Sequence, residues 1–283
     1  MTTIRLAFSP DSDDIFMFWP VLAGKVDAEG LTFVHERRDT EALNALAEEG
    51  TVDVIAVSIA HYASLADRYL LLPHGASVGR GYGPVVVTAG PQSLESLRGK
   101  RIGVPGLRTT AYLALRLVLP EFEPVVVPIA PYSRAFEAVR SGEVDAALLI
   151  HEGRLTYARE GFFMAGDVGE AWTSRTGLPL PLGGNVIRRG LGEALVARTS
   201  RVCRASIAWA LSHRDEVMDA LGREESRGDL AFDRALLDRY LAMYANADTL
   251  DLPGDARQAV ALLLVEAQRA GVVPNRVLPD FAP

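Results

Sequence analysis

The sequence predicts an α/β fold made of two lobes that face each other across a ligand cleft. Three observations lead to this prediction: strands and helices alternate with short connections, one helix–turn–strand pattern occurs twice, and two candidate strands could connect the lobes. The length of 283 residues is sufficient for one large domain or two of average size.

The first part of the chain alternates strands and helices. Strands are expected at 4–9, 31–36 and 52–57, and helices from about Asp13 to Gly24, over 40–49 and over 59–69. Aspartates directly before the first apolar run are typical helix caps. The strands are nearly all apolar, which is typical of a parallel sheet that is buried on both faces.

The second part repeats this organisation. Strands are expected at 85–88, 101–104, 125–129 and 144–150, and helices at 94–97, 109–119 and 133–140. Residues 42–54 run from a helix through Glu49-Gly50 into an apolar strand, and residues 135–147 do the same through Ser141-Gly142. Two units built alike indicate two lobes that face one another.

The segments 85–88 and 185–188 are candidates for a two-stranded hinge. Lobe I would then comprise residues 1–88 and 189–283, and residues 89–188 would form an inserted lobe II. Residues 161–184 have an irregular pattern, and from Gly192 the chain is expected to be helical almost to its end. This is the layout of the type II periplasmic-binding-protein fold, in which the ligand cleft lies between the lobes.

Composition and charge limit the partners. The net charge of -7, from 29 basic and 36 acidic side chains, argues against nucleic acid or an anionic membrane as a partner. The chain begins directly with a strand, and no apolar run approaches the roughly 18 residues that a membrane span needs, so we expect a cytoplasmic protein. The single cysteine, Cys203, lies in a helical pattern and is expected to be a core residue.

Two loops have patterns that resemble ligand sites only in part. The glycine-rich segment 74–84 precedes a strand instead of a helix, so we interpret it as a flexible segment beside the cleft and not as a phosphate loop. The acidic loop 11–14 lacks the glycine and the terminal glutamate of a calcium loop, so helix capping and solvation are favoured over cation binding. No Cys/His spacing indicates a metal site.

The candidate site residues follow strand ends and a helix start. His151 ends the apolar run 146–150, where ligands bind in open α/β sheets, although a histidine there could instead bond a backbone carbonyl. Ser58 has the equivalent place in the first lobe, as a ligand donor or as a helix cap. Thr109, Thr110 and Ala111 begin a helix that could bind a carboxylate, or Thr109 could only cap that helix.

Several motifs together resemble the 1,4-dihydroxy-6-naphthoate synthase family of the futalosine route to menaquinone. They are SPDSDDIF (9–16), VSIAHYA (57–63), GRGYGPVVV (79–87), VPGLRTTAYL (104–113), LIHEGRLTY (149–157), TGLPLPLGG (176–184) and MYANADTLDL (243–252). The resemblance implies a two-lobed cytoplasmic lyase, without metal or organic cofactor, that cleaves the carboxylated substrate cyclic dehypoxanthinyl futalosine.

The resemblance also implies roles for single residues. His151 would be the catalytic base, and the substrate would contact Ala56, Val57 and Ser58 on one lobe and Thr110 and Ala111 on the other. No task is assigned to Glu152, Arg154 or Tyr157.

The chain departs from the family pattern at two places. Familiar members read Ser-Pro-Cys-Pro-Asn-Asp-Thr-Phe at the opening motif, whereas this chain has Asp11, Ser12, Asp13 and Ile15. Ala56 stands where lysine is common; loss of that cation could weaken binding of a carboxylated substrate, or Arg80 or Arg108 could substitute for it. A non-catalytic solute-binding protein of an ABC transporter and the related chorismate dehydratase are the alternatives.

Overall fold

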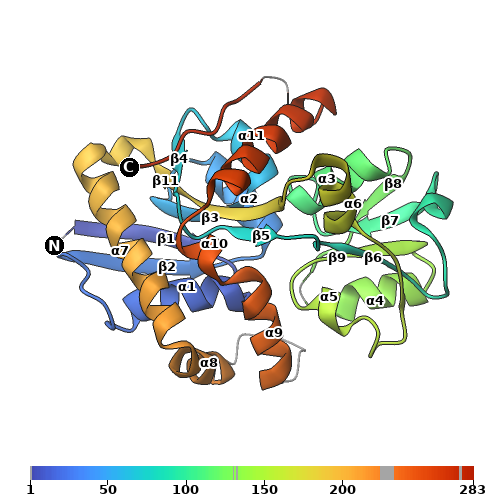
Figure 1. Ribbon diagram of the computed structural model, residues 1–283, viewed down its shortest axis with the longest axis horizontal. Coiled ribbons are helices and arrows are strands. Elements are labelled where there is room, and N and C mark those ends of the chain that lie inside the picture. Colours follow the sequence, from blue (N-terminus) through green and yellow to red (C-terminus); the bar gives the residue numbers. More distant parts are fainter. Residues whose placement is uncertain (1, 130, 132, 224–232, 274–275) are drawn as a thin grey trace.

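Two mixed β-sheets form the centres of two lobes in the computed structural model (Figure 1). The structure describes residues 2–129, 131, 133–223, 233–273 and 276–283. The first sheet has the order β2-β1-β3-β11-β4, with β5 paired to β11, and the second has the order β10-β6-β9-β7-β8. The predicted α/β class is confirmed.

The strands of the first sheet are β1 (Thr2–Phe8), β2 (Leu31–Arg37), β3 (Val54–Ser58), β4 (Tyr69–Leu71), β5 (Ser77–Gly79) and β11 (Leu180–Arg188). Those of the second are β6 (Val85–Thr88), β7 (Arg101–Val104), β8 (Glu123–Val126), β9 (Ala146–Leu149) and β10 (Phe163–Asp167). Strand β1 pairs in parallel with β2 and β3, and β7 pairs in parallel with β8 and β9. Strands β11 and β6 run antiparallel to their partners.

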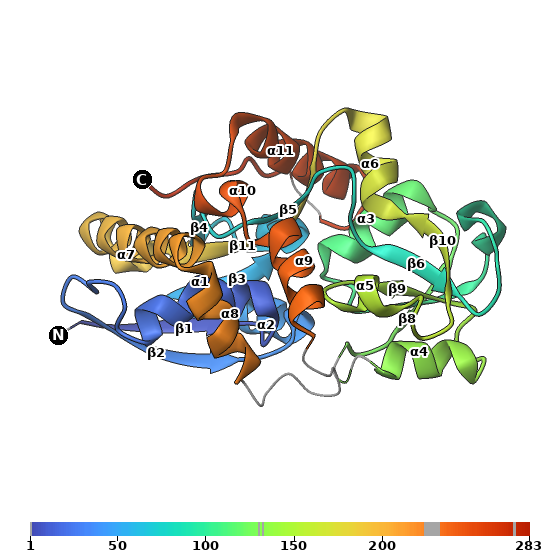
Figure 2. The ribbon, with the colours of Figure 1, turned by 60° about the horizontal axis from the view of Figure 1, so that its bottom comes forward.

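The helices of the first lobe are α1 (Ser12–Leu22), α2 (Thr40–Glu48), α7 (Glu193–Ser212), α8 (Arg214–Gly222), α9 (Arg234–Tyr244), α10 (Ala247–Leu250) and α11 (Gly254–Arg269). Those of the second are α3 (Thr110–Val118), α4 (Ser133–Arg140), α5 (Gly153–Thr156) and α6 (Val168–Thr176). Short 3₁₀ helices are η1 (Ile59–Ser64), η2 (Leu94–Leu97) and η3 (Arg189–Leu191). The views in Figures 1 and 2 both place α9 beside α5, at the junction of the lobes.

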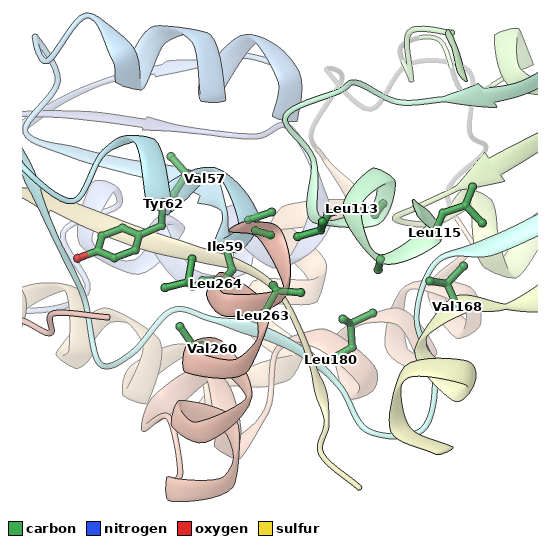
Figure 3. Close-up of a cluster of buried hydrophobic side chains, with 14 of the residues drawn as sticks. Val57, Ile59, Tyr62, Leu113, Leu115, Val168, Leu180, Val260, Leu263 and Leu264 are labelled. Carbon is green, nitrogen blue, oxygen red and sulfur yellow. The ribbon is translucent and has the colours of Figure 1, made fainter. Parts of the chain in front are cut away.

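Three apolar clusters form the core. One packs α1, α7, α8 and α9 against one face of the first sheet, and another lies between the second sheet and α4. The remaining cluster covers the opposite face of the first sheet with α2, η1 and α11, and it continues into α3 and α6 of the second lobe. Figure 3 shows Leu263 and Leu264 of α11, Leu113 of α3 and Leu180 of β11 in this shared cluster. The lobes are therefore joined by buried apolar contact as well as by the chain.

The predicted two-stranded hinge is wrong. Strand β6 lies inside the second sheet between β9 and β10, and β11 pairs with β3, β4 and β5 in the first sheet. The strands that run side by side where the chain passes between the lobes are β5 and β11, with Gly79 opposite Leu180. An apolar run shows that a strand is buried, but it does not identify the partner strand, and for this reason the hinge was misplaced.

The glycine-rich segment is packed, not flexible as predicted. It forms β5 and a tight loop against the start of α6, where a Cβ at Gly169 would lie 2.1 Å from the carbonyl of Tyr82. Glycine is needed there because the two backbones touch.

Two further expectations differ from the structure. Residues 59–69 form the short helix η1 and then β4, and the segment predicted to be irregular contains β10 and α6. Both differences arise where short elements carry mixed patterns that local periodicity does not resolve.

The predicted core position of Cys203 is confirmed, because the residue is buried in α7. Burial raises the pKa of its thiol to about 12. In the described part of the chain, no helix is both long enough and apolar enough to cross a membrane.

Candidate functional site

A cavity between the lobes is lined by all seven residues that the sequence predicts to be catalytic or substrate-binding. Its volume is about 770 Å³, including space that is open to solvent. The predicted residues that line it are Ala56, Val57, Ser58, Thr109, Thr110, Ala111 and His151. The fold thus brings together positions that lie up to 95 residues apart in the sequence, as counted from Ala56 to His151.

His151 lies two residues after the end of β9 and has a backbone conformation that is unusual for a side-chain-bearing residue. Its φ is 50°, in the left-handed region, which costs about 1–2 kcal/mol for residues other than glycine. The side chain is 17% exposed and lies at the cavity wall. Such strain occurs most often where a site requires a particular side-chain direction.

The imidazole of His151 contacts three side chains of the first lobe. Its Nδ1 lies 3.2 Å from Oδ2 of Asp11 and 3.3 Å from the hydroxyl of Tyr240. Its Nε2 lies 3.3 Å from Oγ1 of Thr40, at the start of α2. The alternative prediction, in which this histidine only hydrogen-bonds a backbone carbonyl, is wrong, because the imidazole contacts side chains.

The acidic loop is buried, so its expected role in helix capping and solvation is wrong. Asp11 is the N-cap residue of α1 but makes no side-chain capping hydrogen bond. Asp13 accepts hydrogen bonds from Ser77 at 2.7 Å and from Tyr240 at 3.1 Å, and Asp14 accepts one from the backbone N–H of Ser9 at 2.7 Å. All three carboxyls are buried, and Asp13 and Asp14 line the cavity.

Glu152 adds another buried carboxyl beside His151. The hydroxyl of Ser12 donates a hydrogen bond to it, which connects α1 of the first lobe to the second lobe. Several carboxyls and one imidazole therefore share a single poorly solvated region.

The pKa values of this cluster reflect burial and mutual repulsion. Burial, followed by the negative charge of Asp13, raises the pKa of Asp14 to about 7. The pKa of Asp13 is also raised, chiefly by burial, although His151 opposes the shift. Burial alone would lower the pKa of His151, but Asp11, Asp13 and the other nearby carboxylates together raise it.

Ser58 is held by Asn44 of α2. The Asn44 side chain donates to Oγ of Ser58 at 3.0 Å and accepts from its backbone N–H at 2.9 Å. Ser58 makes no side-chain hydrogen bond that caps η1, so the helix-cap alternative is wrong. The Ser58 hydroxyl accepts from Asn44, which leaves its own proton for a ligand in the cavity.

The helix start at Thr109 combines capping with contact between the lobes. The Thr109 hydroxyl accepts from the N–H of Tyr112, so this residue does cap α3. The Thr110 hydroxyl donates to the carbonyl of Leu182 at 2.6 Å and accepts from the N–H of Ala60 at 3.1 Å. Both hydroxyls are occupied, and the first-turn N–H groups of Thr110 and Ala111 are the donors left for an anion.

The two arginines that could substitute for a lysine at position 56 are paired elsewhere. Arg80 binds Asp248 and Asp255, and Arg108 binds Glu41 and Glu48. Neither is among the described residues that line the cavity.

Among the residues that the structure describes, Arg154 is the arginine that lines the cavity. It donates to Asp167 at 2.8 Å and to the carbonyl of Gly83 at 2.7 Å. Tyr157 packs against the core of the second sheet instead.

Sequence reasoning missed Tyr240, Tyr244 and Thr40, which also line the cavity. Both tyrosines lie on α9, far along the chain from His151, and an aromatic residue on an amphipathic helix looks like any core residue. In the described part of the chain, no group of three or more His, Cys, Asp or Glu residues has the arrangement needed to hold a metal ion.

Comparison with known proteins gives the relationship of the chain. Residues 4–269 match a protein family described as menaquinone biosynthesis. A 1,4-dihydroxy-6-naphthoate synthase of Thermus thermophilus is 39% identical over 99% of this chain and 100% of its own length. The enzyme of the same name from Streptomyces coelicolor is 36% identical over 96% of this chain and 95% of its own length.

Solved structures agree with the architecture. A crystal structure of an Archaeoglobus fulgidus protein has 42% identity and a TM-score of 0.88, and it covers 96% of this chain and 98% of its own. The alkanesulfonate-binding protein SsuA of Xanthomonas axonopodis pv. citri has 16% identity and a TM-score of 0.75 over 99% of this chain and 96% of its own, which shows the periplasmic-binding-protein fold. On this evidence, the chain belongs to the menaquinone biosynthesis family, together with relatives named 1,4-dihydroxy-6-naphthoate synthase.

Proposed function

We propose that this protein is a carbon–carbon lyase that converts cyclic dehypoxanthinyl futalosine to 1,4-dihydroxy-6-naphthoate, with His151 as the general base. The observation that carries the proposal is the position of His151 in the cavity, with Nδ1 beside Asp11 and Tyr240 and Nε2 beside Thr40. The names of the two enzyme relatives support the same reaction.

The chemistry requires a base in a poorly solvated cleft. His151 would remove a proton from the carbocycle, the bond to the sugar-derived fragment would break, and the new ring would become aromatic. The carboxylates around His151 raise its pKa, which makes the neutral imidazole a stronger base and stabilises the imidazolium that it becomes.

The carboxylate of the substrate would bind at the opposite side of the cavity. The N–H groups of Thr110 and Ala111 at the start of α3 and the hydroxyl of Ser58 supply donors from both lobes, while Ala56 and Val57 line the wall. Thr109 would act only by capping α3.

The test is turnover by the purified protein. We expect wild-type protein to release the naphthoate from cyclic dehypoxanthinyl futalosine, and His151→Asn to lose at least about 10²-fold in kcat, the lower limit for general base catalysis. Binding of the product to the variant, measured by calorimetry, should remain within a few-fold of wild type.

Two outcomes would favour the alternatives. Binding without any turnover would indicate a solute-binding protein, and dehydration of chorismate in place of the expected reaction would indicate chorismate dehydratase. Near-normal turnover by His151→Asn would refute the assignment of the base while leaving the substrate assignment intact.

A further inference from the structure

We infer that Asp11 and Tyr240 are positioning residues that hold neutral His151 as its Nδ1–H tautomer and leave Nε2 as the basic atom, and that they do so only when the lobes are together. The inference rests on the proposed role of His151. It concerns how the base is prepared, which neither the family relationship nor the reaction specifies.

The neighbours of Nδ1 determine which ring nitrogen of neutral His151 carries the hydrogen. The hydroxyl of Tyr240 donates to Oδ1 of Asp13 at 3.1 Å, which leaves its oxygen as an acceptor for His151 at 3.3 Å. The Asp11 carboxylate, with Oδ2 3.2 Å from Nδ1, places a negative charge beside the same nitrogen. An accepting oxygen and a negative charge beside the same nitrogen both stabilise the neutral ring with its hydrogen on Nδ1.

The other ring nitrogen, Nε2, then carries no hydrogen and can act as a base. With the hydrogen on Nδ1, Nε2 has a lone pair, to which the Thr40 hydroxyl at 3.3 Å can donate. Thr40 and His151 both line the cavity, so a substrate C–H that displaces this contact would meet the lone pair directly. Nε2 is therefore the atom that would accept the proton.

The three partners of the imidazole come from the lobe opposite to that of His151. His151 belongs to the second sheet, whereas Asp11 precedes α1 and Tyr240 lies on α9, which packs with α1 in the first lobe. Thr40 begins α2, in the same lobe. If the lobes separated, the imidazole would lose all three partners, so the base is fully oriented only after closure.

After it accepts a proton, His151 carries a positive charge that nearby carboxyls can stabilise. Among the described residues, the charged neighbours that raise the pKa of His151 are carboxyls from the start of α1 and from its own loop: Asp11, Asp13, Asp14 and Glu152. Tyr240 faces it from α9. Among the carboxyls, Asp11 is the one in ion-pair contact with the ring, so it can both orient the base and stabilise the imidazolium.

The test is the tautomer of His151 together with the kinetics. In ¹⁵N NMR of histidine-labelled protein, with the His151 signals identified by their loss in His151→Asn, neutral wild-type His151 should be protonated at Nδ1. In Asp11→Asn the side-chain amide can donate to Nδ1, so the ring should shift to the Nε2–H form. The value of kcat should then fall about 10²- to 10⁴-fold, with KM changed only a few-fold.

Glu152→Gln is the matched control because Glu152 is another buried carboxyl whose charge raises the pKa of His151, and its side chain accepts a hydrogen bond from Ser12. It should lower the apparent pKa on the acid side of the rate profile but keep the Nδ1–H tautomer. Tyr240→Phe, which retains the ring packing, should weaken the tautomer preference less than Asp11→Asn does.

An Nε2–H tautomer in neutral wild-type protein would overturn the inference, as would equal tautomers and equal kcat in wild type and Asp11→Asn. The tautomer is measured without substrate. A wild-type protein that does not turn over the proposed substrate would therefore refute the proposed function while the tautomer result still decides this inference.

Discussion

Asp14 is a buried carboxyl whose titration should be visible in the stability of the chain. Its pKa is raised from 3.8 to about 7 in the folded protein, so the folded chain binds more protons than the unfolded chain between these values. The stability that this group contributes is fully present below pH 3.8 and is lost as pH rises through about 7. The slope is at most about 1.4 kcal/mol per pH unit.

Asp14→Asn should remove this dependence, because an amide can still accept from the N–H of Ser9 and does not ionise. We expect the variant to be more stable than wild type by about 1–4 kcal/mol at pH 8, and the difference to disappear toward pH 4. Urea unfolding at several pH values measures it. A constant difference across the whole pH range would contradict the assignment.

At the residue level, the sequence could predict the site only where local pattern shows the location. Ser58 ends an apolar strand, His151 lies two residues after another, and Thr109 caps a helix, so each was found from its neighbours in the chain. The contacts of the imidazole could not be found in this way, because Asp11 and Tyr240 meet it from distant positions. Burial of the acidic loop also depends on the second lobe.

At the level of elements, the contact between the glycine-rich loop and α6 should be sensitive to one methyl group. A Cβ at Gly169 would overlap the backbone of Tyr82, which cannot move aside as a flexible side chain could. Gly169→Ala should therefore lower the free energy of unfolding by about 1–3 kcal/mol.

Gly90→Ala is the control for this substitution, since a Cβ at Gly90 meets nothing within 4 Å. We expect its urea midpoint to remain near that of wild type. Equal midpoints for the two variants would show that the close approach at Gly169 is not needed for stability.

Elements were predicted well where a single periodicity runs over several residues, as in β1, β2, α2 and α4. The boundary between lobes was predicted poorly, because the pairing of β5 with β11 involves a three-residue strand with little apolar character. Strand partners are set by tertiary packing, which a one-dimensional pattern does not contain.

At the scale of the whole molecule, exposed ion pairs between the lobes should favour closure modestly. Arg108 of the second lobe bonds Glu41 and Glu48 on α2 of the first. Such exposed pairs contribute about 0.2–1 kcal/mol, so Arg108→Ala should raise KM by less than about fivefold and leave kcat nearly unchanged. Steady-state kinetics at low and high salt measure this, and the difference from wild type should shrink at high salt.

Arg201→Ala is the comparison, because Arg201 pairs with Glu29 inside the first lobe. Its KM should match that of wild type at every salt concentration. The same rise in KM for both variants would mean that general surface charge, and not closure, is responsible.

Closure of the two lobes could not be predicted from the sequence. The pattern predicted two lobes. Two features depend on how the lobes meet: the apolar cluster that α11 and α3 share, and the hydrogen bond from Thr110 to β11. These contacts describe a molecule with its lobes together.

The burial of Cys203 has a practical consequence for observing lobe motion. The chain has one cysteine, and its thiol is enclosed in α7 with its pKa raised to about 12, so it will react very slowly with maleimides at neutral pH. New cysteines at exposed positions, such as Ala194 on one lobe and Ser96 on the other, would therefore take fluorophores selectively without removal of the native residue. The natural protein is already a suitable background for energy-transfer measurements of opening and closing.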